Sequence, residues 1–159
     1  MTLNNIATAT YEEAHLFASF ALKGKTDKAG DPLIAHAVRM ADLDLGDDHR
    51  VLSILHDVIE DSDAILGFDH STRGTLSLGG LRLVLAPEVA WALKLITRLS
   101  SETYAEYIGR VATYPLAAAV KITDLRDHLD VHDAFILPAS LRKRYTVALD
   151  RLSATAVKP

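Results

Sequence analysis

Residues 56–61, which read His-Asp-Val-Ile-Glu-Asp, place one imidazole and three carboxylates within a single short segment. The adjacent side chains of His56 and Asp57 diverge by about 100° around a helix, so a metal ion can lie between them. Glu60 follows His56 by four residues and shares its helical face. A carboxylate in that position can orient or deprotonate an attacking water. The pattern therefore predicts a metal-dependent hydrolytic site.

Two more distant residues complete a candidate ligand set. His36 lies in an apolar segment, where a histidine is also compatible with a position in the core between two helices. Asp124 interrupts another apolar segment, and burial of an unpaired carboxylate costs free energy that a cation would remove. The chain has no Cys, so a metal must be held by His and carboxylate groups, a chemistry that suits manganese, iron or zinc better than calcium or magnesium. The candidate ligands are His36, His56, Asp57 and Asp124.

The segments that must position these residues have the periodicity of helices. Apolar spacing, proline positions and capping residues predict helices over about 11–23, 32–43, 51–59, 87–97, 115–129 and 138–152, and another that follows a cap at Ser100 or Ser101 and contains 104–111. Residues from about 66 to 80 are rich in Gly, Ser and Thr and lack a helical period, which predicts a long loop. No strand is predicted, so the expected fold class is all-α.

Composition limits the possible partners and location. The 159 residues are 49% hydrophobic and 24% charged, which is typical of one soluble domain. A net charge of −4 argues against nucleic acid as a partner. The sequence has no apolar run of about 20 residues, so no membrane partner is expected. It also has no signal-peptide pattern at its start, which predicts a cytoplasmic location. A monomer and a homodimer are both compatible with the sequence.

The order of a His, a His-Asp pair and a distant Asp resembles that of the HD-domain metal-dependent phosphohydrolases. Residues 28–36 (Lys-Ala-Gly-Asp-Pro-Leu-Ile-Ala-His), 56–61 and 120–124 (Val-Lys-Ile-Thr-Asp) look more closely like the hydrolase domain of the RelA/SpoT proteins and the small alarmone hydrolases. The resemblance covers about 11–129. It implies that residues 1–159 form a single HD-domain helical bundle, with the motifs in that core and a C-terminal helix over about 138–152.

The resemblance also implies an activity. Members of this family hydrolyse the 3′-pyrophosphate of ppGpp and pppGpp, the alarmones of the stringent response, to GDP or GTP and pyrophosphate. By resemblance, the four candidate ligands hold a divalent cation, usually manganese, and Glu60 and Asp61 position and activate the attacking water. Lys28 occupies the place of a lysine that contacts the substrate. The residues expected to bind this small nucleotide are Lys25, Lys28, Thr97, Arg98, Tyr104 and His128.

Three positions depart from the family pattern. Asp27 stands where the family usually has an Arg, Leu22 where it often has a His, and His128 where an Asn commonly touches the nucleotide. Asp27 and His128 motivate an alternative, which is hydrolysis of another nucleotide such as NADPH or a nucleoside monophosphate. A second alternative is a nucleotide-binding module without catalysis. The presence of both Glu60 and Asp61 argues against that module.

Other charged residues and histidines are expected at the rim of the site, on the surface or in structural positions. The cations expected to attract phosphates at the rim of the site are Lys25, Lys28, Arg39, Lys121 and Arg126, although Lys121 is also placed to pair with a nearby carboxylate. The basic segment 142–145 is interpreted as a solvated helix face. No partner spacing supports a site role for the remaining histidines, which are treated as surface or structural residues: His15, His49, His70 and His132.

Overall fold

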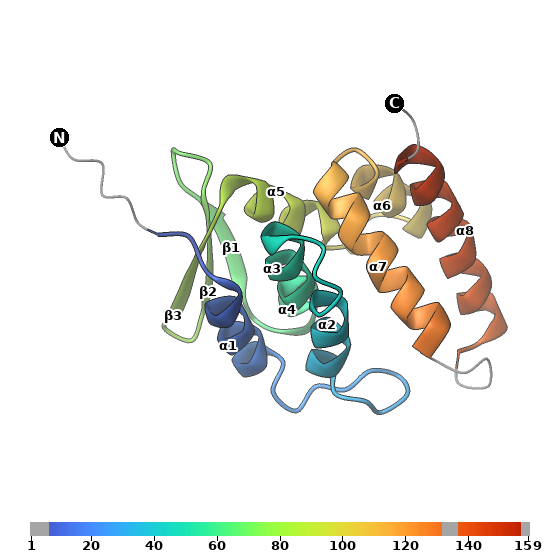
Figure 1. Cartoon of the computed structure of the whole chain (residues 1–159), viewed down its shortest axis with the longest axis horizontal. Coiled ribbons are helices and arrows are strands. Elements are labelled where there is room, and N and C mark those ends of the chain that lie inside the picture. Colours follow the sequence, from blue (N-terminus) through green and yellow to red (C-terminus); the bar gives the residue numbers. More distant parts are fainter. Residues whose placement is uncertain (1–6, 132–136, 157–159) are drawn as a thin grey trace.

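The computed structural model describes residues 7–131 and 137–156 and shows a body of helices flanked by a small antiparallel sheet (Figure 1). The helices are α1 (Tyr11–Ala21), α2 (Leu33–Ala41), α3 (Asp47–Leu55), α4 (Val58–Asp61), α5 (Pro87–Ile96), α6 (Tyr104–Val111), α7 (Pro115–Val131) and α8 (Ala139–Ala156). The strands are β1 (Ile65–Phe68), β2 (Gly74–Leu78) and β3 (Leu81–Leu85). The prediction of a mainly helical fold is confirmed. Within the described ranges, none of the helices has the length and hydropathy needed to cross a bilayer.

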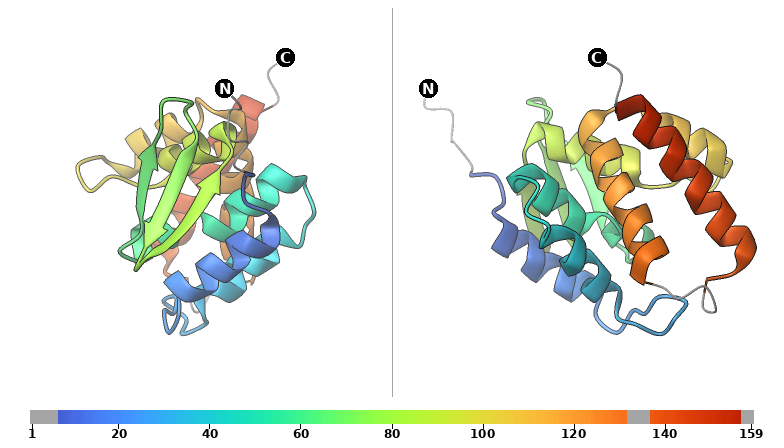
Figure 2. Two further views of the ribbon diagram at one scale, coloured as in Figure 1. Left: turned by 90° about the vertical axis from the view of Figure 1, so that its left-hand side faces the viewer. Right: turned by 45° about the vertical axis from the view of Figure 1, so that its right-hand side comes forward.

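The sheet corrects the prediction of an all-α fold and of a loop over 66–80. Its strands pair in the order β1-β2-β3 (Figure 2, left). Gly79 and Gly80 form the turn between β2 and β3 with φ of 53° and 85°, a left-handed conformation that glycine adopts without strain. The resulting register places Leu76 opposite Leu83, and both side chains are buried. The absence of a helical period does not distinguish a loop from strands. This segment has apolar residues in alternation on both sides of a Gly-Gly turn, which is the pattern of a hairpin.

Gly74 lies where the sheet packs closely against α5. A Cβ atom built on Gly74 would lie 2.5 Å from Cβ of Ala90 and 2.9 Å from Cδ1 of Leu66. We expect Gly74→Ala to lower the free energy of unfolding by about 1–3 kcal/mol, because the backbone of the sheet must shift to admit the methyl group. Denaturant titration measures this loss. Gly67→Ala is the matched control, since a Cβ on Gly67 meets no atom within 4 Å; equal stabilities of the two variants would contradict the prediction.

Two helices begin with the same local motif. The hydroxyls of Thr10 and Thr103 each accept a hydrogen bond from the backbone N–H three residues later, and the glutamate at that later position accepts one from the threonine N–H. Each capping box satisfies two backbone donors that the first turn leaves unpaired. Thr10 is the N-cap of α1. The predicted cap of α6 at Ser100 or Ser101 is wrong, because Thr103 caps that helix.

Helix α3 lies at the centre of the fold. It packs against α1, α2, α5 and α7 and contributes the fully buried side chains of Leu52, Ile54 and Leu55. Helix α8 returns along α7, and the two long helices lie side by side (Figure 2, right). Because α2 and α7 both contact α3, side chains near the end of α3 can meet side chains from both helices.

The helix predicted over 51–59 is divided at its functional residues. Helix α3 ends at Leu55, and the short α4 begins at Val58. His56 is the C-terminal cap of α3, while Asp57 is the N-terminal cap of α4 and has a ψ of −6°. This junction places the His-Asp pair at a bend rather than along one continuous face, and the two carboxylates that follow lie on α4.

Candidate functional site

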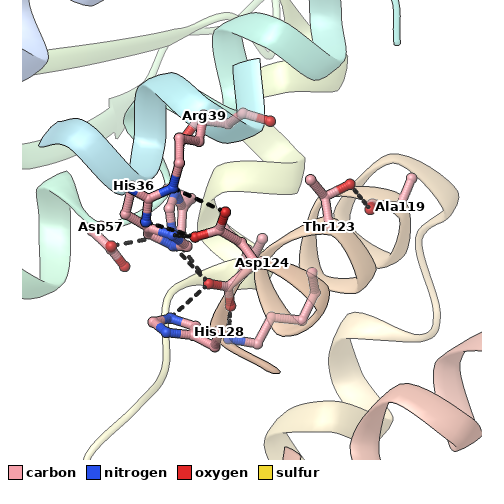
Figure 3. A network of polar contacts seen from close by, with 12 residues as sticks. His36, Arg39, Asp57, Ala119, Thr123, Asp124 and His128 are labelled. Atoms are coloured by element: carbon pink, nitrogen blue, oxygen red, sulfur yellow. Dashed lines mark hydrogen bonds and ion pairs between the residues drawn. The ribbon is translucent and has the colours of Figure 1, made fainter. Parts of the chain in front are cut away.

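Buried side chains from three helical segments converge beside α3. His36 comes from α2, His56 from the end of α3 and Asp124 from α7, and one ligand atom of each lies within 4.8 Å of the others. Figure 3 shows the side chains of His36 and Asp124 pointing toward one another. His36 Nε2 is 2.9 Å from Asp124 Oδ1, and His56 Nε2 is 3.7 Å from the same oxygen. Asp57 Oδ2 lies 3.1 Å from His56 Nε2. The structure therefore brings together all four candidate ligands.

Hydrogen bonds on the outer side of the two imidazoles orient both rings. His56 Nδ1 is 2.7 Å from the carbonyl oxygen of Ser53, which can only accept, so Nδ1 carries a proton. His36 Nδ1 is 2.6 Å from Oδ2 of Asp127, which is also an acceptor when ionised. Both rings therefore direct Nε2 toward Asp124. This is the arrangement in which an imidazole offers its free lone pair to a metal.

The chemistry of this cluster fits a divalent metal ion. His56 Nε2 is buried and has no hydrogen-bond partner of good geometry in the part of the chain that the structure describes. Burial alone would lower the pKa of His56, but the carboxylates of Asp57 and Asp124 raise it well above its ordinary value. The carboxylates therefore favour a cation between the imidazole and carboxylate groups of the cluster, which face one another. Two imidazoles and two carboxylates are a donor set typical of manganese, iron or zinc.

Asp124 is held from its other side by Lys121. Lys121 Nζ lies 2.5 Å from Asp124 Oδ2, which leaves Oδ1 facing the histidines. Burial opposes ionisation of Asp124, but the ammonium of Lys121 and the neighbouring imidazoles lower its pKa well below the ordinary value. The expectation that Lys121 attracts phosphates at the rim is therefore not supported, whereas the pairing with a nearby carboxylate is observed.

His128 lies beside the cluster of candidate metal ligands as well as in the cleft. Its Nε2 is 3.1 Å from Asp124 Oδ1, and its ring centroid is 4.5 Å from that of His36. His128 also lines the cleft described next. The structure thus places this predicted substrate residue where a ligand in the cleft and the carboxylate of Asp124 can both reach it.

A cleft of about 350 Å³ opens beside the cluster. The predicted residues that line it are Lys28, Asp57, Glu60, Asp61 and His128. Sequence reasoning missed its apolar and aromatic wall, which comes from α2, α8 and the residues just before α8: Leu33, Leu137, Pro138, Leu141 and Tyr145. Tyr145 was included in a segment interpreted as a solvated face, yet it is half-buried. Only the packing of α8 against α7 reveals this wall.

Four predicted substrate residues lie outside the lining of the cleft. Lys25 is exposed, and its charge partly opposes the rise that burial causes in the pKa of Asp61. The hydroxyl of Thr97 donates to the carbonyl of Leu93, which closes the end of α5. Tyr104 lines a separate groove between α6 and α8, together with Arg144. These positions give no direct support for substrate contact by Thr97 or Tyr104.

Arg98 acts on the site through its backbone. Its N–H donates a 2.5 Å hydrogen bond to Oε1 of Glu60, while its guanidinium lies over the ring of Tyr104. Burial raises the pKa of Glu60, and this backbone hydrogen bond partly opposes the rise. Burial and the charge of Asp57 likewise raise the pKa of Asp61. Both carboxyls therefore bind protons more readily than ordinary ones, as a general base operating near neutral pH requires.

The loop that carries Lys28 is organised by Asp27. The Oδ1 atom of Asp27 accepts hydrogen bonds from the backbone N–H groups of Ala29, at 2.8 Å, and Asp31, at 3.0 Å. The carboxylate thus closes a compact turn, as aspartate commonly does. This structural role accounts for an aspartate at this position, and the carboxylate adds a negative charge to the wall of the cleft.

The other histidines lie outside this cluster where they are described. His49 is buried behind the site, where its Nε2 is 3.2 Å from the hydroxyl of Thr123. This contact agrees with the structural role expected for His49. The corresponding expectation for His132 lies outside the described residues.

Comparison with known proteins adds evidence on the fold. No family model matches the chain, and no curated protein matches its sequence. A solved structure does match: a metazoan ortholog of SpoT that hydrolyses ppGpp and plays a role in starvation responses. This chain shares the fold of that hydrolase. The TM-score is 0.65 with 22% sequence identity, over 95% of this chain and 87% of the other. The resemblance to HD-domain hydrolases is thus confirmed at the level of the fold.

Proposed function

We propose that this chain is a metal-dependent phosphohydrolase that removes the 3′-pyrophosphate of the guanosine alarmones ppGpp and pppGpp. One observation carries the proposal: Glu60 and Asp61 line the same cleft as Asp57, so two water-activating carboxylates and a candidate metal ligand face a common space. A fold shared with a hydrolase of ppGpp supports the same class of substrate. His36, His56, Asp57 and Asp124 would hold the metal, with manganese as the first candidate.

Each group in the cleft has a distinct role in this reaction. A divalent cation bound by the four ligands would act as a Lewis acid toward a phosphoryl oxygen. Glu60, held by the N–H of Arg98, takes a proton from the attacking water. Asp61 lies beside it in the cleft wall and orients the same water through a second hydrogen bond. Lys28 lies in the loop between α1 and α2 and provides positive charge for a phosphate in the cleft.

The other wall of the cleft suits a nucleoside. Its side chains offer an apolar surface and one aromatic ring, against which a purine base can stack. Because α8 provides Tyr145 and α7 provides both Asp124 and His128, the packing of these two helices fixes the distance between the base and the reacting phosphate. The wall consists of Leu33, Leu137, Pro138, Leu141 and Tyr145.

A specific observation favours a second candidate, a nucleotide with fewer negative charges, such as a nucleoside monophosphate or NADPH. Among the described residues that line the cleft, Lys28 is the one lysine or arginine, and it faces four carboxylates: Asp27, Asp57, Glu60 and Asp61. A substrate with two pyrophosphate groups brings more negative charge than Lys28 and a divalent cation together balance. A reacting group of one phosphate, such as that of a nucleoside monophosphate or the 2′-phosphate of NADPH, brings less negative charge to these carboxylates than a pyrophosphate does.

Turnover of a nucleotide panel by manganese-loaded protein tests the proposal. The panel contains ppGpp, pppGpp, NADPH and nucleoside monophosphates, and phosphate and pyrophosphate are detected separately. We expect pyrophosphate together with GDP or GTP, loss of turnover after treatment with EDTA and recovery when manganese is restored. Release of phosphate from NADPH or a monophosphate, with the alarmones left intact, would assign the second candidate. Tight binding without product over several hours would instead identify a nucleotide-binding module.

A further inference from the structure

Asp127 occupies a position behind the metal cluster that sequence reasoning did not assign. It lies on α7, three residues after Asp124, and its side chain is 12% exposed. Its Oδ2 atom is 2.6 Å from Nδ1 of His36, whereas the Nε2 atom of the same ring faces Asp124 in the cluster. One turn of α7 therefore contacts both nitrogens of the same imidazole, through Asp124 at Nε2 and Asp127 at Nδ1.

Arg39 fixes the carboxylate of Asp127. Its Nε lies 3.1 Å from Oδ1 and its Nη2 lies 2.9 Å from Oδ2, which is a two-point contact between a planar guanidinium and a carboxylate. Arg39 and His36 are three residues apart on α2, so both reach the same side of α7. This pairing engages the guanidinium that sequence reasoning had assigned to phosphates. It also prevents the carboxylate from rotating away from the imidazole.

We propose that Asp127, held in place by Arg39, is a positioning residue that fixes the tautomer and orientation of His36 for metal binding. The inference rests on the proposed function in one respect, namely that the cluster holds a divalent metal. A carboxylate at Nδ1 keeps the proton on that nitrogen and leaves the lone pair of Nε2 directed into the cluster. It also makes the imidazole a stronger donor. Among the described residues, the guanidinium of Arg39 donates both of its hydrogen bonds to Asp127, so we assign its effect on the metal to that carboxylate.

Metal affinity measured without nucleotide tests this role. Cobalt(II) and zinc(II) are titrated against a competing chromophoric chelator for the wild-type protein, Asp127→Asn, Arg39→Met and the double variant. We expect D127N to weaken metal binding about 10- to 100-fold, which is the usual effect of removing such a carboxylate partner. R39M should cause a smaller loss. The double variant should bind metal no more weakly than D127N alone, because the proposed effect of Arg39 on metal binding depends on its contact with Asp127.

Controls separate this role from a merely structural one. Asp130→Asn removes an exposed carboxylate one turn further along α7 and should leave metal affinity unchanged. Asp127→Glu keeps a carboxylate and should recover part of the lost affinity. A structural role alone would lower the melting temperature of metal-free D127N and leave metal affinity the same. If D127N does not fold, the metal affinity of R39M is compared with that of D130N instead. The proposal then requires R39M to bind metal more weakly than D130N.

The result separates the two proposals. Equal metal affinities of the wild-type protein, D127N and R39M would remove the positioning role, even if the protein hydrolyses nucleotides. Additive losses in the double variant would show that Arg39 acts independently of Asp127 and would overturn its assigned role. A wild-type protein that binds metal but hydrolyses no nucleotide would contradict the proposed function, whereas weaker metal binding by D127N would still support the role of Asp127.

Discussion

Replacement of Asp124 by asparagine is expected to abolish metal-dependent hydrolysis and to lower the free energy of unfolding of the metal-free protein by about 3–5 kcal/mol. The first effect follows because Asp124 Oδ1 faces His36, His56 and His128, so its charge is central to the cluster. The second follows because Lys121 loses the carboxylate with which it pairs. Metal affinity should fall by more than the roughly 100-fold expected for an outer partner such as Asp127.

A double variant distinguishes the two effects of this substitution. In Asp124→Asn combined with Lys121→Met, both charges of the pair are gone, and uncharged replacements of a buried ion pair are often close to neutral in stability. We therefore expect the double variant to recover most of the lost stability and none of the metal binding. Thermal unfolding and cobalt(II) titration provide the two measurements. Metal binding by D124N at wild-type affinity would show that Asp124 is not a ligand.

The location of the cluster could be predicted from sequence because each ligand stands in a strongly patterned segment. A carboxylate in the apolar helix that holds Asp124 needs a partner, and the His-Asp pair at 56–57 provides one. The bend between α3 and α4 could not be predicted in this way, since residues on both sides of it are apolar with helical spacing. The sheet was missed for a different reason: Gly79 and Gly80 signal a hairpin only when strand alternation is considered.

The remaining errors concern contacts that depend on tertiary structure. Arg39 and Lys121 both resemble rim cations in the sequence, but α7 places Asp127 beside the first and Asp124 beside the second. Arg98 contacts Glu60 through a backbone N–H, a group that nearly every residue type has, so its side chain carries no signal of the contact. Tyr145 lines the cleft because of how α8 packs along α7, which the sequence of α8 alone does not specify.

Replacement of Glu60 by glutamine is expected to lower kcat by about 10²- to 10⁴-fold, the usual contribution of a general base. Glutamine keeps an oxygen that can accept the hydrogen bond from Arg98 N–H, so the fold and metal binding should be retained. The loss should therefore appear in kcat, with metal affinity unchanged. Glu12→Gln is a matched control, because Glu12 is an exposed residue of α1 that does not line the cleft, and its replacement should leave kcat unchanged.

The same substitution should stabilise the metal-free protein at neutral pH. Burial raises the pKa of Glu60 in the folded state, so its ionised form is less favourable in the folded protein than in the unfolded chain. At pH values above this raised pKa, the ionised carboxylate lowers the free energy of unfolding of the wild-type protein. The uncharged glutamine has no such effect. We expect E60Q to melt at a higher temperature than wild type at pH 7, and the difference to shrink as the pH falls through the pKa of Glu60. A lower melting temperature for E60Q at pH 7 would contradict this prediction, because it would show that the ionised carboxylate of Glu60 stabilises the folded state.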